Sequence, residues 1–480
     1  MSGEAISLTA STAGARSQPV GSDALDHIAR GDAFSRNGQL VEAANCFEFA
    51  IRLNPDLPMA HNNLGFVHEQ NGDVVRALAC YRRAVELNGS FRLAQINLAS
   101  LLSKVGRSAE AQPIWLSLTA SHPLDRALLG HVINQFLEHG DVQSAASVAE
   151  QYALLTRGSE WLKNDAGVIP IPDVPSPSPL LSSAKLQHDL EQFRYLRRIG
   201  ILEIDKDFTS IIDGYERVLQ RVKPLGDDAR VEFNDADREL IGRAYNRIIH
   251  RPAAPRVLSA FSDTWSPQAA EKEYLASELG LVVLDNVLAE DALISLRRFC
   301  LESTIWFTNR YSYGRLGAFF REGFNCPLLV QLAEELRGVF PRVIGDRHRL
   351  LQMWAFKYGY SQPQTGAHAD FAAVNVNLWL TPGEANKGGG GLVLYDTEAP
   401  ADWDFATYNG LRGTTIITDL LAKRQSRAIT IPYRANRAVI FNSDLFHTTE
   451  AVDFREGYEN RRVNVTLLFG RREDARDPKP

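Results

Sequence analysis

The fold is decided by the stretch at residues 367–380, which reads AHADFAAVNVNLWL. Apolar and polar residues alternate along its second half, and a period of two is the pattern of a β-strand. The same period runs from Leu350 towards the C-terminus, so we expect β-structure there. Asn375 and Asn377 share one face of this strand. Asparagine is disfavoured inside strands unless its amide meets partners, so these residues either line a pocket or are polar residues of an edge strand.

A His-x-Asp pair, His368 and Asp370, opens this stretch, and His447 follows on a later predicted strand. Side chains at positions i and i+2 of an extended segment point the same way, so the pair can reach one metal ion. The third ligand must then come from a neighbouring strand. Two imidazoles and one carboxylate on one face of an octahedral ion suit Fe(II) with a chelating co-substrate and O2. The alternative is a surface turn holding the pair, with an unrelated His447.

These segments resemble the double-stranded β-helix core of the 2-oxoglutarate oxygenases, especially the prolyl-hydroxylase-like branch. The resemblance spans residues 281–472 and is firmest over 350–470. Tyr358 lies ten residues before His368, where that branch often has a tyrosine that contacts the co-substrate. The resemblance implies a jelly-roll or cupin-like barrel in which the three residues above bind Fe(II), with 2-oxoglutarate and O2 as co-substrates. It also implies an oxidoreductase, most often a hydroxylase, acting on a protein or peptide side chain or a small metabolite.

The resemblance also requires a cation for the distal carboxylate of 2-oxoglutarate, which arginine can bind with two parallel hydrogen bonds. Arg461 and Arg462 begin the last predicted strand, RVNVTLLF. Alternation places Arg462, Asn464 and Thr466 on its polar face, which suits a ligand pocket. We therefore assign the carboxylate to Arg462, with Thr466 as a second contact and Asn377 as a neighbour in the pocket. Arg461 remains the alternative for this role.

Two other classes of protein compete with the oxygenase interpretation. One is an interaction scaffold whose barrel no longer catalyses, and the other is a cupin-like metalloenzyme that does not use 2-oxoglutarate. The intact set of three metal-ligand residues argues against the scaffold. Arg462 argues against the second class, because an enzyme without 2-oxoglutarate has no need of a deep carboxylate clamp.

Two further segments lie within this domain. The glycine run at 388–391 is interpreted as a flexible β-turn rather than a phosphate loop, because no GK[ST] follows and no helix begins there. The insertion at 396–436 is expected to cover the active site as a substrate lid. Its aromatic residues either serve that lid or simply pack the loop: Trp403, Phe405 and Tyr408.

The first third of the chain repeats every 34 residues. Three positions show the repeat: Gly38, Gly72, Gly106 and Gly140; Ala43, Ala77, Ala111 and Ala145; and Phe47, Tyr81, Trp115 and Ala149. This pattern resembles the tetratricopeptide repeat (TPR), in which small residues let antiparallel helices approach and an aromatic fills the gap between pairs. We expect about four repeats within 24–159, at residues 24–57, 58–91, 92–125 and 126–159, and the fourth is weak.

Repeats of this kind form an α-solenoid, which usually presents a concave face to a peptide or a partner protein. That face is our first expectation for a partner site. Two alternatives are a surface for homodimerisation and a shield for the catalytic domain.

The middle of the chain connects these two parts. Residues 160–182 are rich in proline, which favours a boundary or a semi-rigid spacer. Residues 183–280 are expected to be a helical connecting segment that docks the repeats onto the oxygenase-like domain. Three amphipathic helices are predicted within it, near Leu186–Leu196, Phe208–Leu219 and Leu240–Ile249. Outside these parts, we expect a disordered N-terminus at 1–23 and a tail at 473–480.

Composition sets the remaining limits. The chain has 480 residues and a net charge of −6, so it offers no electrostatic basis for binding nucleic acid or an anionic membrane. Its four cysteines form no CxxC pair, so neither a zinc knuckle nor a disulfide scaffold is indicated. The first 20 residues lack the pattern of a secretory signal, and no apolar run is long enough to span a bilayer. We therefore expect a cytoplasmic protein.

Overall fold

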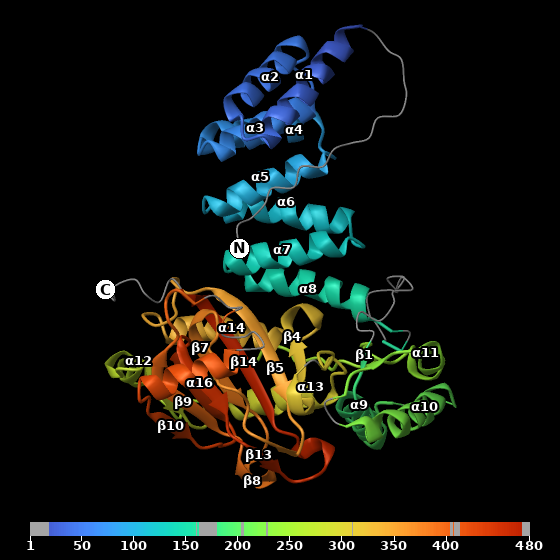
Figure 1. Ribbon diagram of the computed structural model, residues 1–480, viewed down its shortest axis with the longest axis vertical. Helices are drawn as coiled ribbons and strands as arrows, with labels where there is room; N and C mark the ends of the chain where they lie inside the picture. The colour runs from blue at the N-terminus through green and yellow to red at the C-terminus, as the bar shows by residue number, and fades with distance from the viewer. Residues whose placement is uncertain are drawn as a thin grey trace. The chain divides into compact units, whose positions relative to one another are not determined.

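The computed structural model describes residues 19–159, 161–162, 180–202, 206–226, 229–309, 311–403, 407 and 413–472. They fall into two compact units, divided in sequence between Leu128 and Leu129. The first is helical, and the second combines helices with antiparallel β-sheets (Figure 1). Most of the predicted spacer lies outside the described residues, as do the first 18 residues and the predicted tail. No helix in the described ranges is long and apolar enough to cross a membrane.

Three pairs of helices make up the first unit. They are α1 (Pro19–Arg36), α2 (Leu40–Leu53), α3 (Pro58–Gln70), α4 (Val74–Leu87), α5 (Arg92–Lys104) and α6 (Ser108–Ser121). The turn inside each pair carries the recurring glycine in a left-handed conformation, with φ of +73° at Gly38 and +76° at Gly72. Because other residues adopt this conformation only with strain, glycine at this position ends the first helix of the pair.

The packing inside each pair explains the other repeated positions. A Cβ atom placed on Gly31 would lie 2.5 Å from the ring of Phe47, and one placed on Gly65 would lie 2.7 Å from the ring of Tyr81. Each ring is buried against the glycine of the facing helix. Neither partner can grow without displacing the other, so the small residue and the aromatic recur together.

The fourth predicted repeat is made of two helices, α7 (Arg126–Glu138) and α8 (Val142–Arg157). Arg157 at the end of α8 donates from Nε to the carboxylate of Glu322 at 3.1 Å. Arg349 donates from Nη1 to the backbone carbonyl of His139 at 2.6 Å. These contacts join α7 and α8 to the β-rich region, with which they share the second unit.

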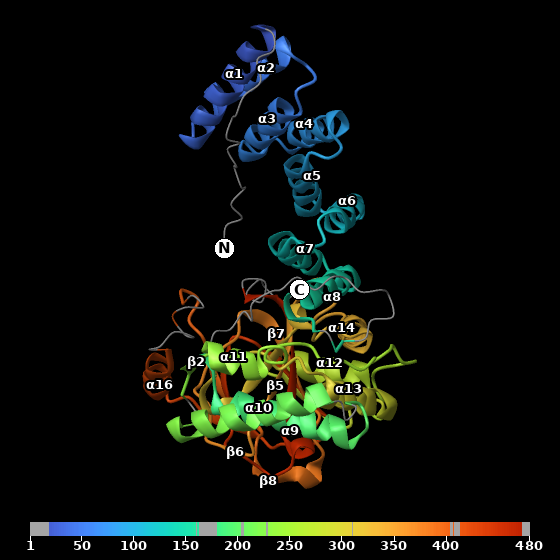
Figure 2. The same ribbon diagram turned by 90° about the vertical axis from the view of Figure 1, so that its right-hand side faces the viewer.

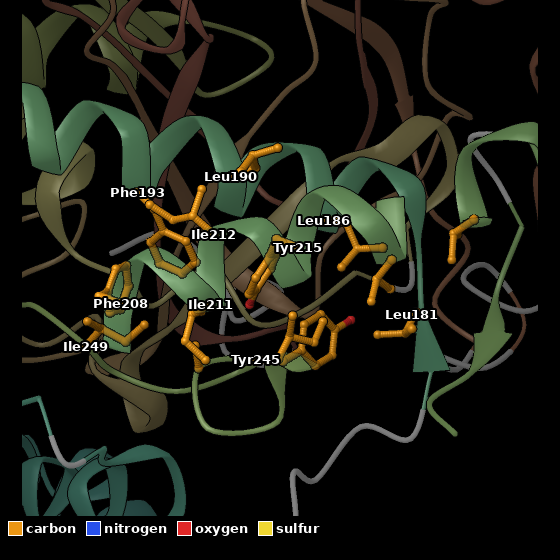
Figure 3. Close-up of a cluster of buried hydrophobic side chains, with 14 of the residues drawn as sticks. Leu181, Leu186, Leu190, Phe193, Phe208, Ile211, Ile212, Tyr215, Tyr245 and Ile249 are labelled. Carbon is orange, nitrogen blue, oxygen red and sulfur yellow. The ribbon is translucent and has the colours of Figure 1, made fainter. Parts of the chain in front are cut away.

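The connecting segment contains α9 (Ser183–Arg198) and α10 (Lys206–Val222), which lie side by side (Figure 2). Their apolar faces form a buried cluster (Figure 3): Leu186, Leu190, Phe193, Phe208, Ile211, Ile212 and Tyr215. The predicted third helix at 240–249 is wrong, because α11 spans Asp235–Ile241 and the chain then turns, with φ of +58° at Asn246. Tyr245 and Ile249 still reach the cluster. Their apolar spacing therefore reflects burial and not a helical period.

Three antiparallel sheets follow in the second unit, with the strand orders β3-β11-β7-β14-β5-β4, β10-β9-β12 and β6-β13-β8. The largest contains β3 (Leu281–Leu284), β4 (Leu316–Phe319), β5 (Leu350–Lys357), β7 (Ala372–Trp379), β11 (Arg437–Asn442) and β14 (Val463–Arg471). The others contain β6 (Ser361–Gln362), β8 (Asn386–Gly389), β9 (Leu392–Glu398), β10 (Ala428–Ile431), β12 (Leu445–Thr449) and β13 (Val452–Phe454). A short pair, β1 (Leu180–Leu181) with β2 (Val231–Glu232), lies in the connecting segment.

Helices accompany these sheets: α12 (Pro267–Ala276), α13 (Glu290–Glu302), α14 (Pro327–Val339) and α16 (Gly413–Lys423). Every residue of β7 is buried, including Asn375 and Asn377. β7 lies between β11 and β14, so the edge-strand alternative for these two asparagines is wrong. The sheet therefore has a polar, buried strip at its centre, on the strand that His368 and Asp370 precede.

Candidate metal centre

Two histidines meet across a backbone bridge. His368 precedes β7 and His447 lies in β12, and their amide groups exchange hydrogen bonds of 3.0 and 2.8 Å. Asp370 follows two residues after His368, as the strand period predicted. One ligand atom from each of these three residues lies within 4.8 Å of the other two. The structure thus brings together all three residues that the sequence selected as metal ligands.

Both imidazole rings are held so that Nε2 remains for another partner. Nδ1 of His368 lies 3.1 Å from the carbonyl of Gly366, and Nδ1 of His447 lies 3.0 Å from the carbonyl of Leu445. A carbonyl can only accept, so Nδ1 carries the proton in each ring and Nε2 presents its lone pair. The Nε2 atom of His447 is 3.5 Å from Oδ2 of Asp370. Such contacts to Nδ1 fix the orientation of metal-binding histidines.

The ionisation states suit a divalent metal. Burial, reinforced by the nearby His447, lowers the pKa of His368 to about 4. Burial opposes ionisation of Asp370, but hydrogen bonding and the positive influence of both histidines outweigh it and lower the pKa of this carboxyl. Near neutral pH the site therefore offers a neutral imidazole at His368 and a carboxylate at Asp370, which are the forms that bind metal.

A chain of amide hydrogen bonds runs from Asp370 into the sheet. Asn375 donates to Asp370 at 2.6 Å, and Asn377 donates to Asn375 at 2.7 Å. The carbonyl oxygen of Asn377 then accepts from Asn464 at 2.8 Å and from Thr466 at 3.0 Å. The register of β7 and β14 sets Thr466 opposite Asn377, which explains this meeting. The chain fixes the Asp370 carboxylate and connects it to the strand that Arg462 precedes.

The two candidate arginines have different surroundings. Arg461 pairs with Glu191 of α9, with Nε 2.9 Å from the carboxylate. Arg462 is 1% exposed and donates from Nε to the carbonyl of Gly390 at 2.7 Å. Its guanidinium lies 4.5 Å from the ring centre of Tyr358, and its Nη1 is buried without a hydrogen-bond partner. Within the described residues Arg462 has no acidic partner, so its charge is available to an anion.

The glycine run has a role that sequence interpretation missed. Its first part is strand β8, which pairs with β13, and is not the flexible turn that was expected. Gly390 follows with φ of +74°, and a Cβ atom there would lie 2.8 Å from the ring of Phe454. The absence of a side chain lets the Gly390 carbonyl approach Arg462.

Tyr358 meets a second arginine, which sequence interpretation also missed. The hydroxyl of Tyr358 is 3.2 Å from that of Thr449 and accepts a long hydrogen bond of 3.5 Å from Nη1 of Arg315. Arg315 immediately precedes β4, and its guanidinium also lies 4.5 Å from the ring centre of Phe356. The only signal in the sequence was an arginine within a loop rich in tyrosine, glycine and phenylalanine.

The insertion at 396–436 packs beside the candidate metal ligands. Ile417 of α16 belongs to a buried cluster with Ala369, which separates His368 from Asp370, and with Phe446, which precedes His447. Trp403 packs against the same cluster. Phe405 and Tyr408, which were expected either to serve the lid or to pack the loop, lie outside the described residues.

We expect Asn375→Ala to weaken Fe(II) binding by about 10- to 100-fold, the usual effect of removing a group that orients a metal ligand. The reason is that Asp370 loses its 2.6 Å hydrogen bond and its fixed orientation. Metal titration of the full-length protein would measure the effect. Asn442→Ala is a suitable control, because Asn442 donates to the exposed Glu398. Equal affinities in the two variants would contradict the orienting role of Asn375.

Comparison with known proteins bears on the helical region. A family model described as TPR repeat matches residues 31–72, and one described as tetratricopeptide repeat matches residues 58–91. No curated protein matches the chain.

Several solved structures resemble parts of the chain. The first TPR of Spaghetti (RPAP3), bound to an HSP90 peptide, is 18% identical, with a TM-score of 0.23, and the match covers 23% of this chain and 91% of that one. YrrB, described as a TPR protein with an unusual peptide-binding site, is 17% identical, with a TM-score of 0.25 and coverages of 27% and 66%. A tetratricopeptide repeat protein from Parabacteroides merdae is 21% identical, with a TM-score of 0.25 and coverages of 27% and 52%.

The two family models fall on the helix pairs that carry the 34-residue pattern. The N-terminal region of this chain is therefore made of tetratricopeptide repeats.

Proposed function

We propose that this chain is a non-haem, Fe(II)- and 2-oxoglutarate-dependent oxygenase whose TPR repeats bind a protein or peptide partner. One observation carries the proposal: a strip of polar side chains runs from a His-Asp-His cluster to the strand that an unpaired, buried arginine precedes. A metal explains the cluster, and an anionic co-substrate explains the arginine. Hydroxylation is the outcome that we favour, on a side chain or on a small metabolite.

The strand arrangement supports a double-stranded β-helix, the jelly-roll or cupin-like barrel of this enzyme class. From β10 to β12 the chain passes between two sheets: β9, β10 and β12 lie in one three-stranded sheet, and β11 lies in the six-stranded sheet. β13 then lies in the other three-stranded sheet, and β14 returns to the six-stranded sheet. Alternation of antiparallel strands between two sheets is typical of jelly rolls. In such a barrel, His447 on β12 and the residues beside β7 line the space between the sheets.

The three side chains fit an iron ion. Ligand atoms at about 2.1 Å from one ion lie roughly 3 Å apart when they share one face of its coordination sphere. The Nε2 atom of His447 and the Oδ2 atom of Asp370 are 3.5 Å apart, so small side-chain rotations close the set. Three protein ligands leave the remaining positions to co-substrates.

Arg462 fits the distal carboxylate of 2-oxoglutarate. Burial of a guanidinium without an acidic partner is unfavourable, and a carboxylate ligand offsets that cost through charge-assisted hydrogen bonds. Thr466 and Asn377 lie along the same polar strip, and Tyr358 packs against the Arg462 guanidinium. When bound, iron supplies the reaction of O2 with 2-oxoglutarate, which releases succinate and CO2 and oxidises the substrate. The protein binds both partners, orients them and excludes water.

Two competing functions are supported less well. A cupin-like metalloenzyme without 2-oxoglutarate would use the same metal ligands but would leave Arg462 unexplained. A scaffold with a non-catalytic barrel would need neither the orienting carbonyls nor the amide chain around Asp370. The repeats themselves favour an interaction with a protein or peptide, in addition to catalysis.

The test is 2-oxoglutarate binding to the full-length protein with Fe(II) under anaerobic conditions, followed through the weak visible charge-transfer band. We expect a band that requires both components and that is lost in His368→Ala. Metal binding without a band would favour the cupin-like enzyme. Absence of metal binding would favour the scaffold.

We further expect 2-oxoglutarate to raise the pKa of Tyr358. Burial alone would raise this pKa, but the charges of Arg315 and Arg462 outweigh burial and lower it to about 8. A bound dianion offsets those charges, so the phenolate should form only at higher pH, nearer the ordinary value of about 10. Difference absorbance between wild type and Tyr358→Phe, with Zn(II) and with or without 2-oxoglutarate, isolates this one tyrosine.

The same pKa has a consequence for stability. Because the folded pKa lies below the unfolded value, Tyr358 contributes stability that grows as pH rises from about 8 towards ~10 and is absent at lower pH. Bound 2-oxoglutarate should reduce this increase in stability with pH. A Tyr358 titration that 2-oxoglutarate leaves unchanged would place the co-substrate carboxylate away from these arginines.

A further inference from the structure

Arg315 is the second unpaired cation beside the candidate metal centre. Leu316 pairs with Lys357 in the β4–β5 register, so Arg315 and Tyr358 are the next residues along these two strands. Its guanidinium lies 5.7 Å from the ring centre of Tyr358, on which Arg462 also packs. Tyr358 therefore lies near both guanidinium groups.

The hydrogen-bonding capacity of Arg315 is mostly unused. Nη1 makes the 3.5 Å contact with the Tyr358 hydroxyl, and Nε is buried without a partner. Aromatic rings cover the guanidinium, with ring centres 4.8 Å away at Tyr311 and 4.5 Å away at Phe356. Among the described residues, no carboxylate pairs with it. A guanidinium that is flanked by aromatic rings and has an unused N–H donor is suited to bidentate recognition of a planar anion.

Three buried arginines in the second unit have acidic partners, whereas the buried Arg462 and the partly buried Arg315 have none among the described residues. Arg157 pairs with Glu322, and Arg461 pairs with Glu191. Arg472 pairs with Asp444 at 2.5 Å. An arginine that is needed only for packing can take an internal acid as a partner, as these three do. Arg315 and Arg462 have no such internal acid, so a buried or partly buried positive charge remains without a negative partner at each.

The charges of the pocket indicate how many anions it accepts. Arg315 and Arg462 contribute two positive charges, Asp370 contributes one negative charge, and a divalent metal contributes two positive charges. One 2-oxoglutarate dianion leaves a single positive charge. The distal carboxylate of that dianion can occupy Arg462, which leaves Arg315 as the group that is still unpaired.

We propose that Arg315 binds a carboxylate of the primary substrate and so holds the substrate beside the metal centre. This inference rests on the proposed function, because it is the co-substrate that occupies Arg462. The carboxylate can belong to a small acid or to an acidic side chain of a peptide. Both offer the same planar, two-oxygen partner to the guanidinium.

Two measurements on the full-length protein, loaded with Zn(II) and 2-oxoglutarate, test the proposal. The first is the affinity for 2-oxoglutarate in wild type, Arg315→Gln and Arg462→Gln. The second is ligand-detected NMR with two matched pairs of probes. Butyrate against butyramide represents a small acid, and N-acetylglutamate amide against N-acetylglutamine amide represents a peptide side chain.

We expect a carboxylate probe to bind better than its amide, and Arg315→Gln to weaken that binding by about 10-fold or more, the effect of losing charge-assisted hydrogen bonds. The affinity of Arg315→Gln for 2-oxoglutarate should stay within about three-fold of wild type, whereas Arg462→Gln should lose at least about 10-fold. The probe pair whose carboxylate binding depends on Arg315 identifies the source of the carboxylate, a small acid or a peptide side chain. Arg256→Gln is the control, because Arg256 is exposed and pairs with Glu334.

Three outcomes would overturn the proposal. Arg315→Gln could lose 2-oxoglutarate affinity as Arg462→Gln does, which would place Arg315 in the co-substrate clamp. Carboxylate binding could survive in Arg315→Gln, or the acids and amides could bind equally. A wild-type protein that binds neither Zn(II) nor 2-oxoglutarate would instead disprove the proposed function. The same carboxylate and amide probes would then be measured on protein without Zn(II) and 2-oxoglutarate. Loss of carboxylate binding in Arg315→Gln would support an anion site at Arg315, and unchanged carboxylate binding would overturn it. Arg315→Lys checks that loss of charge, and not misfolding, causes the effect.

Discussion

Asp370→Ala is expected to abolish Fe(II)- and 2-oxoglutarate-dependent oxidation and to weaken Fe(II) binding by more than about 100-fold. Loss of a group that merely orients a ligand costs up to about 100-fold in metal affinity, so loss of a ligand should cost more. Asp370 is also the one carboxylate in the candidate ligand set, and Asn375 holds it in place. Metal titration and the succinate released from 2-oxoglutarate under air would measure the two effects.

The control for this variant is Asp453→Ala, which removes an exposed carboxylate that pairs with Lys387 on β8. It should retain metal affinity, and both variants should keep their helical content, because the first three repeats form a compact unit of their own. Normal turnover in Asp370→Ala would disprove the metal assignment. Lost turnover with retained Fe(II) affinity would show that Asp370 has a role other than ligation.

The candidate metal-ligand residues could be selected from sequence because a strand has a period of two. His-x-Asp spacing gives a shared direction without any knowledge of the fold. What spacing could not show is the bridge between His368 and His447, which lie 79 positions apart in the sequence. The positions of the carbonyls that accept from both Nδ1 atoms depend on the local backbone conformation of each segment. That conformation could not be predicted from the composition.

The choice between Arg461 and Arg462 illustrates a different limit. Alternation along β14 separated a polar from an apolar face, but both arginines precede the strand and both are buried. What distinguishes them is Glu191, which comes from α9 and pairs with Arg461. Nothing in the sequence connects α9 to that position. The unpaired state of Arg462 is therefore visible only in three dimensions.

Arg315 was missed, and a helix at 240–249 was wrongly predicted, because irregular segments have no period. Arg315 lies beside a short turn in which Gly314 has φ of +71°, so no face can be assigned from spacing. Tyr245 and Ile249 have helical spacing and are buried, but Asn246 turns the chain between them. The 34-residue repeat succeeded for the opposite reason. Gly31 packs against Phe47 as Gly65 packs against Tyr81, and such repetition identifies the structure.

Arg462→Ala is expected to raise the Kd for 2-oxoglutarate by about 10- to 100-fold, because hydrogen bonds to charged groups contribute about 1.5–3 kcal/mol. Arg462 is 1% exposed and keeps Nη1 free of protein partners, so its loss removes the cation without releasing a buried acid. Affinity for the metal alone should stay near that of wild type, because the three ligands and Asn375 are untouched. Calorimetry with Zn(II)-loaded protein would separate the two affinities.

Arg461→Ala provides the matched comparison, since it removes the neighbouring arginine from the same strand start. That change leaves Glu191 without its 2.9 Å partner, so we expect lower thermal stability but an almost unchanged Kd for 2-oxoglutarate. The reverse result, with 2-oxoglutarate affinity lost in Arg461→Ala and kept in Arg462→Ala, would move the clamp to Arg461. If both variants bound 2-oxoglutarate like wild type, neither arginine would contact the co-substrate, and the unpaired charge of Arg462 would have to serve another anion.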